Sequence, residues 1–290
     1  MDQQSRWLLA WMNEDEAISA LLGRSPSPGE DITEPRRVWR NSRAALQRRR
    51  PFRQSTPALS KLQGKLKKRA EEFRQRPDVI ADLDGQDWTV GMVDLRNLLS
   101  FHRVVDEDAL QRAQRVVPED PDSLFSFCLP RPGLDARVSG AIDKVNRTVT
   151  LTSQNYKFRI GSPVIVDLEV STSPGQPPRK EKHIGFTVGF GAPFVQVVEC
   201  NGRWLLRDGY HRCYGLLKRS ICKIPCVFTK VRDFAETGAA APGFFPYEIL
   251  FGDRPPFLTD FLDDSVSETT KRAAQQKVVR IAASEFAVEI

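Results

Sequence analysis

The sequence predicts an α+β protein that begins with a helical extension. The runs VQVVEC and RWLL have the composition of strands and flank Asn201-Gly202, a dipeptide that favours a tight hairpin turn because both central residues take positive φ. A helix-like run from about His211 to Lys218 follows the glycine at 209, and KIPCVFTKV then has the pattern of a closing strand. Apolar residues at helical spacing in the first 77 residues predict the extension.

Length and composition set the class of protein. The chain has 290 residues, of which 40% are hydrophobic, enough for one large domain or two modest ones. No apolar stretch approaches the roughly 18 residues of a membrane-spanning helix, so we expect no membrane partner. The start of the chain lacks a secretory pattern and the cysteines are odd in number, which favours a cytoplasmic protein with reduced thiols; they are Cys128, Cys200, Cys213, Cys222 and Cys226.

Positive charge is concentrated in one segment. The net charge is +6, but residues 24–77 hold 16 Lys and Arg against 5 Asp and Glu, a local charge of +11. The rest of the chain therefore carries −5, and any electrostatic partner is expected to bind the N-terminal part.

The first expected element is a helix over residues 1–24. Asn13 is placed to cap it, Glu16 stands three positions later as in a capping box, and Gly23 is placed to end it. Residues 23–37 are rich in Pro, Ser and Gly without an apolar period, and this composition predicts a linker.

A second helix is expected from Thr56, with Pro57 in its first turn and Pro77 at its end. Its apolar positions recur every three or four residues: Leu59, Leu62, Leu66, Ala70 and Phe73. Residues 36–76 are then either an arm that binds DNA or RNA phosphates or a solvated helix face whose leucines pack on the main domain. The basic residues concerned are Arg48, Arg49, Arg50, Lys61, Lys65, Lys67, Lys68 and Arg69.

These patterns divide the chain into three parts: a basic extension over 1–77, a main domain over 86–232 and a C-terminal extension over 233–290. The main domain opens with a strand at Thr89–Val93 and a helix beginning near Asp106. An insertion lies near residues 116–182, where strand-like alternation leads into a Pro-rich basic loop over residues 171–182. The C-terminal extension ends in a strand-like run, KVVRIAASEFAVEI.

The turn Asp208-Gly209-Tyr210-His211-Arg212 is the strongest candidate site. A glycine at a helix start lets the backbone approach a ligand closely, and the N–H groups of the first helical turn favour an anion. Arg212 adds a planar set of donors and His211 can donate or shuttle a proton, so a phosphate pocket is one interpretation. The alternative is an ordinary turn with a structural histidine.

The surrounding segment, APFVQVVECNGRWLLRDGYHRCYGLLKRSICKIPCVFTKV, resembles the central part of the ParB/sulfiredoxin-like superfamily. In that family a hairpin leads to a D-G-x-H-R or G-x-x-R turn, a helix and a strand that opens with Ile-Pro. Gly209, His211, Arg212, Ile224 and Pro225 match this pattern in order. The resemblance implies a mixed sheet with flanking helices in which Gly209, Tyr210, His211 and Arg212 bind a nucleotide phosphate.

A second patch upstream, VGMVDLRNLLSFHRVVDEDALQRA, is similar to the family's opening strand, a loop that faces the nucleotide and the helix after it. This alignment implies that His102 is a base or phosphate contact and that Arg103 contacts the phosphates.

The resemblance implies phosphoryl transfer or nucleotide hydrolysis, with Asp208, His211 and His102 as catalytic candidates and a nucleoside triphosphate or diphosphate as cofactor. Mg²⁺ would need a carboxylate, and Asp208 is the nearest, although an Asp before a glycine turn often only caps the turn. Tyr210 stands where the sulfinic acid reductases carry a cysteine, which disfavours their chemistry. The alternative is a non-catalytic module that binds nucleic acid or a protein through the basic arm. A homodimer stays open.

The remaining candidates favour structural roles. Cys222 and Cys226 are separated by three residues and have no second ligand pair, so buried thiols are expected and no metal site is assigned. His183 opens an apolar strand and is expected to be structural.

Overall fold

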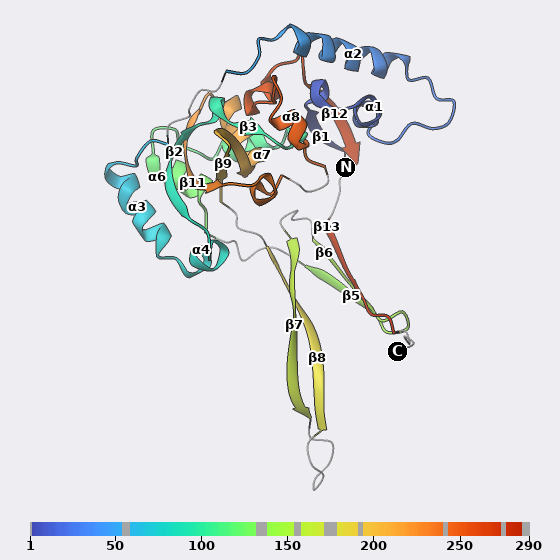
Figure 1. Ribbon diagram of the computed structural model, residues 1–290, viewed down its shortest axis with the longest axis vertical. Helices are drawn as coiled ribbons and strands as arrows, with labels where there is room; N and C mark the ends of the chain where they lie inside the picture. The colour runs from blue at the N-terminus through green and yellow to red at the C-terminus, as the bar shows by residue number, and fades with distance from the viewer. Residues whose placement is uncertain are drawn as a thin grey trace. The chain divides into compact units, whose positions relative to one another are not determined.

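The computed structural model describes residues 2–53, 59–131, 138–153, 158–170, 179–190, 194–239, 243–273 and 277–285 (Figure 1). The chain forms two compact units. Unit 1 comprises Met1–Arg131 with Pro193–Ala274, and unit 2 comprises Pro132–Ala192 with Gln275–Ile290. In the described part of the chain, no helix is long and apolar enough to cross a membrane.

A mixed five-stranded sheet forms the centre of unit 1 (Figure 1). Its order is β2 (Trp88–Asp94), β11 (Lys223–Val231), β9 (Gln196–Cys200), β10 (Arg203–Asp208) and β3 (Leu99–Ser100). The β2–β11 and β9–β10 pairs are antiparallel, whereas the β11–β9 and β10–β3 pairs are parallel. The mixed sheet and its helices confirm the α+β class.

The central hairpin was predicted correctly. Asn201 and Gly202 have φ values of 49° and 78° and connect β9 to β10, as the turn chemistry requires. The helix after the glycine turn, α7 (Tyr210–Lys218), begins one residue before the predicted start, and KIPCVFTKV forms β11.

Short helices pack around this sheet. They include α5 (Ala109–Ala113), which packs on α7, and α6 (Pro121–Cys128), which packs on β11. The α5–α7 contact depends on Gly215, because a Cβ there would lie 2.4 Å from the carbonyl oxygen of Ala109. The helix predicted to begin near Asp106 was misplaced: Asp106 ends a strand, and α5 begins three residues later.

The second sheet of unit 1 corrects the prediction of one helix over residues 1–24. Its order is β12 (Glu268–Ala273), β1 (Asp2–Trp7) and β4 (Val104–Asp106), with β1 antiparallel to both neighbours. The helix prediction is wrong for residues 2–7 because β1 is specified by partners far away in the chain. The predicted helix is confined to α1 (Glu14–Leu22).

The ends of α1 were predicted correctly. Asn13 and Glu16 form both hydrogen bonds of a capping box, and Gly23 ends the helix with a φ of 70°.

The other N-terminal helices were predicted only within residues 56–77. They are α2 (Thr33–Arg48), α3 (Gly64–Arg74) and α4 (Pro77–Asp82). The linker predicted over 23–37 is shorter, because α2 starts at Thr33. The helix predicted from residue 56 starts at Gly64, and the predicted cap Thr56 and Pro57 lie outside the described residues. Ala70 and Phe73 are buried as expected.

The remaining short helical elements of unit 1 are η1 (Leu9–Trp11), η2 (Leu95–Asn97), η3 (Phe234–Thr237), α8 (Tyr247–Leu250) and η4 (Leu258–Leu262).

Unit 2 contains two separate sheets. One has the order β13 (Lys277–Ala282), β6 (Thr148–Ser153) and β5 (Ser139–Asp143), and β13 is the predicted C-terminal strand. The other is a two-stranded antiparallel ribbon of β7 (Phe158–Val170) and β8 (Arg179–Phe190). The loop predicted over 171–182 is therefore wrong from Arg179 onward, and residues 171–178 lie outside the described part.

Candidate functional site

The glycine turn begins α7 as the sequence predicts. Gly209 is the N-cap residue with a φ of 85°, and it supplies no side-chain cap to the first turn. A Cβ at this position would also lie 2.8 Å from Cγ2 of Val195, so conformation and space both require glycine. The N–H of Gly209 donates to Oδ1 of Asp208 at 2.5 Å. Asp208 therefore shapes the turn, which is the turn-capping role considered from the sequence.

His211 is held by Asp106. The backbone N–H of Asp106 donates to Nδ1 of His211 at 3.0 Å, and Oδ2 of the same residue lies 3.5 Å from Nε2. The Asp106 carboxylate is almost fully buried and also accepts a hydrogen bond from the Ser5 hydroxyl at 3.2 Å. Because Nδ1 accepts a hydrogen bond, the neutral ring carries its proton on Nε2. His211 is thus arranged as a donor rather than as a proton acceptor.

His102 lies against the first residue of α7. Its ring stacks on Tyr210 with centroids 3.4 Å apart, and Phe101 and Phe244 complete an aromatic enclosure. Its Nε2 is buried and has no hydrogen-bond partner among the described residues. The upstream patch and the glycine turn are therefore brought together, as the two-part resemblance implies.

Burial lowers the pKa of His102 well below 6.5, and the nearby His211 acts in the same direction, whereas a backbone hydrogen bond with Arg207 opposes them. Since Nε2 is unpartnered, Nδ1 makes the bond with the backbone of Arg207. The neutral imidazole then presents the lone pair of Nε2 as a hydrogen-bond acceptor. Such a nitrogen can accept a hydrogen bond from water or from a hydroxyl group.

The two arginines predicted to contact phosphate have protein partners. Nη1 of Arg212 donates to the carbonyl of Phe127 at 3.0 Å, and its Nη2 is buried without a partner in the described structure. Arg103 donates twice to the carbonyl of Phe244, at 3.2 and 2.8 Å, and pairs with Glu16. Arg212 therefore ties α7 to α6, and Arg103 ties its own segment to Phe244 and Glu16. Phosphate binding by either arginine stays a prediction.

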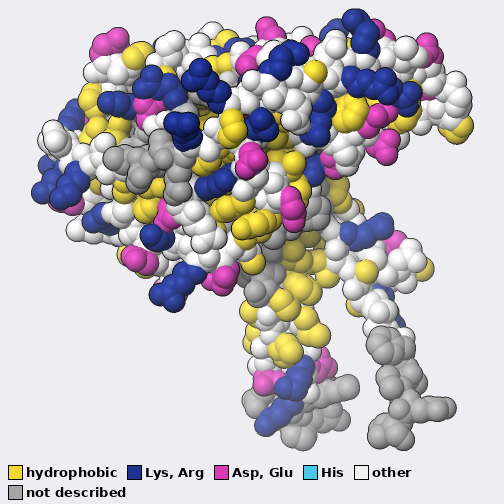
Figure 2. All heavy atoms as spheres, turned by 45° about the horizontal axis from the view of Figure 1, so that its top comes forward, with side chains coloured by type: hydrophobic (Ala, Val, Ile, Leu, Met, Phe, Trp, Pro, Cys, Tyr) yellow, Lys and Arg dark blue, Asp and Glu magenta, His cyan; other side chains and the backbone are white. Residues whose placement is uncertain are grey.

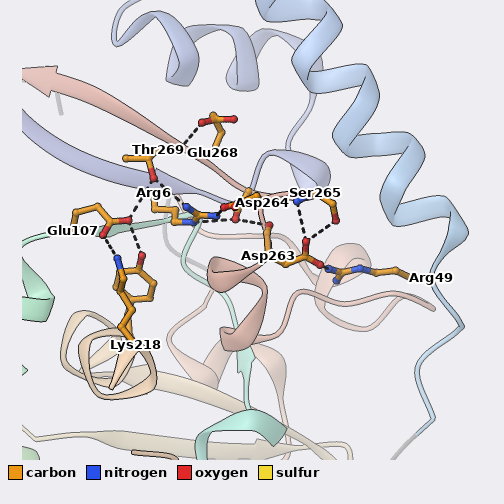
Figure 3. Close-up of polar contacts among 11 residues, drawn as sticks. Arg6, Arg49, Glu107, Lys218, Asp263, Asp264, Ser265, Glu268 and Thr269 are labelled. Carbon is orange, nitrogen blue, oxygen red and sulfur yellow. Dashed lines mark hydrogen bonds and ion pairs between the residues drawn. The ribbon is translucent and has the colours of Figure 1, made fainter. Parts of the chain in front are cut away.

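Two acidic residues of this site were missed from the sequence, Asp106 and Glu107. Glu107 accepts hydrogen bonds from the Tyr214 hydroxyl at 2.7 Å and from Nζ of Lys218 at 2.6 Å; Figure 3 shows Lys218 pointing to it. His211, Tyr214 and Lys218 are spaced three and four residues apart, so they share one face of α7. That polar face could have indicated acidic partners, but not where they lie in the chain.

The ionisation of these groups follows from their contacts. Burial alone would raise the pKa of Glu107, but the bonds from Lys218 and Tyr214 outweigh it and lower the pKa. Burial and the Glu107 carboxylate raise the pKa of Tyr214. The Glu107 contacts therefore join an ionised carboxylate to a neutral phenol and an ammonium group.

A second polar cluster fixes the C-terminal part of unit 1 (Figure 3). Arg49, one of the predicted phosphate-binding residues of the basic arm, donates to Asp260 at 2.7 Å and to Asp263 at 2.6 Å. The Arg49 guanidinium also lies over the ring of Trp11, and the indole nitrogen of Trp11 donates to the carbonyl of Arg254. Lys65 of the arm likewise pairs with Asp122. Part of the positive charge of the arm is thus used within unit 1.

The cysteines near α7 are buried thiols. Burial raises the pKa of Cys128 to about 12 and raises those of Cys213 and Cys226. Cys222, which was expected to be buried, is half-buried. Thiols with raised pKa values are poor nucleophiles at neutral pH.

Within the described ranges, no group of three or more His, Cys, Asp or Glu side chains is arranged to hold a metal ion. Comparisons of the chain with protein-family models, with curated proteins and with solved structures found no match.

Proposed function

We propose that this protein binds a nucleotide, or a related phosphate ester, at the N-terminal turn of α7 and transfers its phosphoryl group to water or to a hydroxyl acceptor. The observation that carries the proposal is the unpartnered, buried Nε2 of His102 beside Tyr210, the first residue of α7. A buried polar atom without a partner costs about 1–3 kcal/mol, so its persistence favours a ligand group that pairs with it.

The turn supplies the anion-binding part. Gly209 leaves the first turn of α7 without a side-chain cap, and the N–H groups and dipole of a helix start favour a phosphate. Under this proposal the five-stranded sheet with α7 is the nucleotide domain of ParB/sulfiredoxin type that the sequence resemblance implies.

The acidic residues beside the turn favour a nucleotide that is bound to Mg²⁺. Asp106 and Asp208 lie beside the turn, and two carboxylates repel a bare phosphate. A nucleotide that carries Mg²⁺ reduces this repulsion, with most of the ion's ligands supplied by phosphate oxygens and water. Binding should therefore be tighter with Mg²⁺ than without it.

The roles of the two histidines differ. The Nε2 lone pair of His102 would accept the proton of the attacking water or hydroxyl, because the negative charge of a bound phosphate raises the histidine pKa that burial lowers. His211, fixed through its Nδ1 by Asp106, would orient the turn and donate from Nε2. The bond between the transferred phosphorus and the oxygen of the leaving phosphate breaks. A bond forms between that phosphorus and the oxygen that His102 deprotonates.

The test is calorimetric titration and phosphate-release assays with ATP, ADP and AMP, each with and without Mg²⁺. We expect binding and turnover for the wild type, and for His102→Phe retained binding with a rate lower by about 100-fold or more, the size of a general-base contribution. His183→Gln, a change at the histidine of β8, is the matched control. Absence of binding of every nucleotide at millimolar concentration would contradict the proposal.

A second candidate function, nucleic-acid binding by the basic arm, is favoured by one observation. A cavity of about 560 Å³ has Arg50, Pro51 and Arg53 in its lining, directly after α2. Figure 2 shows further Lys and Arg side chains along the same part of unit 1. We would expect affinity for single- or double-stranded DNA that falls steeply with salt and weakens in an Arg50→Gln, Arg53→Gln variant. Affinity that does not depend on salt would contradict this role.

A further inference from the structure

One face of the β7–β8 ribbon of unit 2 is apolar from the Phe158–Phe190 pair to the Ile165–Ile184 pair and charged beyond them, at Asp167–Lys182. Side chains of paired residues lie on the same face, and successive pairs alternate between faces. The pairs Ile160–Val188, Pro163–Phe186 and Ile165–Ile184 share a face with Phe158–Phe190. We call this the apolar face; its residues are Phe158, Ile160, Pro163, Ile165, Ile184, Phe186, Val188 and Phe190.

Most of this face is open to solvent. Six of its side chains, all except Phe158 and Pro163, are between 36% and 68% exposed, and Figure 2 shows hydrophobic side chains gathered along the ribbon. In the described part of unit 2, the buried apolar side chains are Phe158 and Val279. A two-stranded ribbon is at most marginally stable by itself, so a face of this kind favours a covering partner.

The opposite face differs in composition. Val164 and Val166 of β7 are 46% and 47% exposed there, but their partners on β8 are Gly185 and His183. Among the paired residues of the ribbon, pairs of two large apolar residues lie on the apolar face, so a partner is expected on that side.

The charged pair beyond the apolar residues is complementary to the same pair in a second copy of the ribbon. Asp167 of β7 and Lys182 of β8 are paired across the ladder, and Nζ of Lys182 lies 3.0 Å from the carboxylate. The acidic residue of this pair is thus on β7 and the basic residue is on β8. When a second ribbon packs on this face around a two-fold axis parallel to the strands, each β7 faces the partner's β8. Apolar side chains then meet apolar side chains, and each Asp167 meets Lys182 of the other copy.

The area of the face suits such a pair. Strands of 12 and 13 residues are about 40 Å long, so two ribbons packed face to face over their whole length, charged pairs included, would bury roughly 1,000 Å² in total. This is close to the smallest area of a specific interface. We propose that the apolar face of the β7–β8 ribbon binds the same face of a second copy of this chain, forming a two-fold dimer.

Sedimentation equilibrium of the full chain between about 1 and 100 µM tests the proposal. We expect a dimer for the wild type and for Val166→Lys, which places a charge on the opposite face. Ile165→Lys places the same charge one residue earlier on the apolar face, and we expect it to weaken dimerisation by about tenfold or more. A monomeric wild type, or a dimer unaffected by Ile165→Lys, would overturn the proposal.

Charge exchange provides an independent test, even if Ile165→Lys perturbs folding. Asp167→Lys and Lys182→Asp each place like charges opposite one another in a homodimer, so each variant alone should dimerise more weakly than the wild type. Their mixture restores opposite charges and should form a one-to-one heterodimer. A mixture that associates no better than its components would overturn the proposed two-fold packing. So would a monomeric protein that binds vesicles of neutral phospholipid, since the apolar face would then contact a membrane surface.

Discussion

The backbone N–H of Asp106 donates a hydrogen bond of 3.0 Å to Nδ1 of His211. This bond joins β4, in the three-stranded sheet, to α7, which connects β10 and β11 of the five-stranded sheet. The next residue, Glu107, binds Tyr214 and Lys218 further along the same helix. One short acidic turn therefore holds α7 over its whole length and sets the direction in which its N-terminus points.

The Asp106–His211 bond should be measurable as stability. His211→Ala removes the acceptor and leaves a buried N–H, so we expect the free energy of unfolding to fall by about 1–3 kcal/mol. His211→Asn can place its Oδ1 near the position of Nδ1 and should recover most of that loss. Urea denaturation of the wild type and the two variants measures this order of stability. Equal stabilities for the Ala and Asn variants would show that the bond contributes nothing.

His102 predicts a pH dependence of stability. Its folded-state pKa lies well below 6.5 because of burial, so below about pH 6.5 the unfolded chain binds a proton that the folded protein does not. The free energy of unfolding therefore falls as the pH drops below 6.5, by up to about 1.4 kcal/mol per pH unit for this residue. In His102→Phe the slope between pH 6.5 and 5 should be smaller. An identical slope in both proteins would exclude the assigned protonation.

Gly209 is required for two separable reasons. Gly209→Ala forces a non-glycine residue to a φ of 85°, which costs about 1–2 kcal/mol, and adds a clash with Cγ2 of Val195. The double variant Gly209→Ala, Val195→Ala removes that side-chain contact while keeping the φ penalty. Thermal unfolding should therefore show a double-mutant coupling, with Gly209→Ala less harmful in the Val195→Ala background than in the wild type. Strict additivity would mean that the clash is relieved by other movements.

Arg212 is expected to contribute to stability through Phe127. Arg212→Met leaves the carbonyl of Phe127 without this donor, and we expect the free energy of unfolding to fall by about 1–3 kcal/mol. Arg212→Gln keeps an N–H donor on a shorter side chain and should lose less. Chemical denaturation compares them, and a Met variant as stable as the wild type would indicate that this bond is dispensable.

Local signals allowed the best sequence predictions. The Asn201-Gly202 turn, the capping box at Asn13 and the helix start after Gly209 each depend on a few neighbouring residues, and all are present in the structure. For the same reason α7 and β11 were placed within a residue or two.

Long-range partners explain what was missed. The strand Asp2–Trp7 pairs with residues about 260 positions later, and its polar sequence has no strand-like alternation of its own. Asp106 was expected to start a helix but ends the short strand β4. This strand was missed because it is specified by its contact with β1. Gly209 and His211 could be proposed from the sequence, but the residue that holds His211 could not, since it lies 105 positions earlier.

Imidazole nitrogen NMR tests the proposed site most directly. The chain has three histidines, His102, His183 and His211, so each ring can be followed separately while ATP is added with Mg²⁺. Binding at the start of α7 predicts saturable shifts of His102 Nε2 and of the His211 nitrogens, with His183 as the unaffected reference. If the signals of His102 and His211 stay unchanged up to millimolar nucleotide, the turn at Gly209 does not bind it.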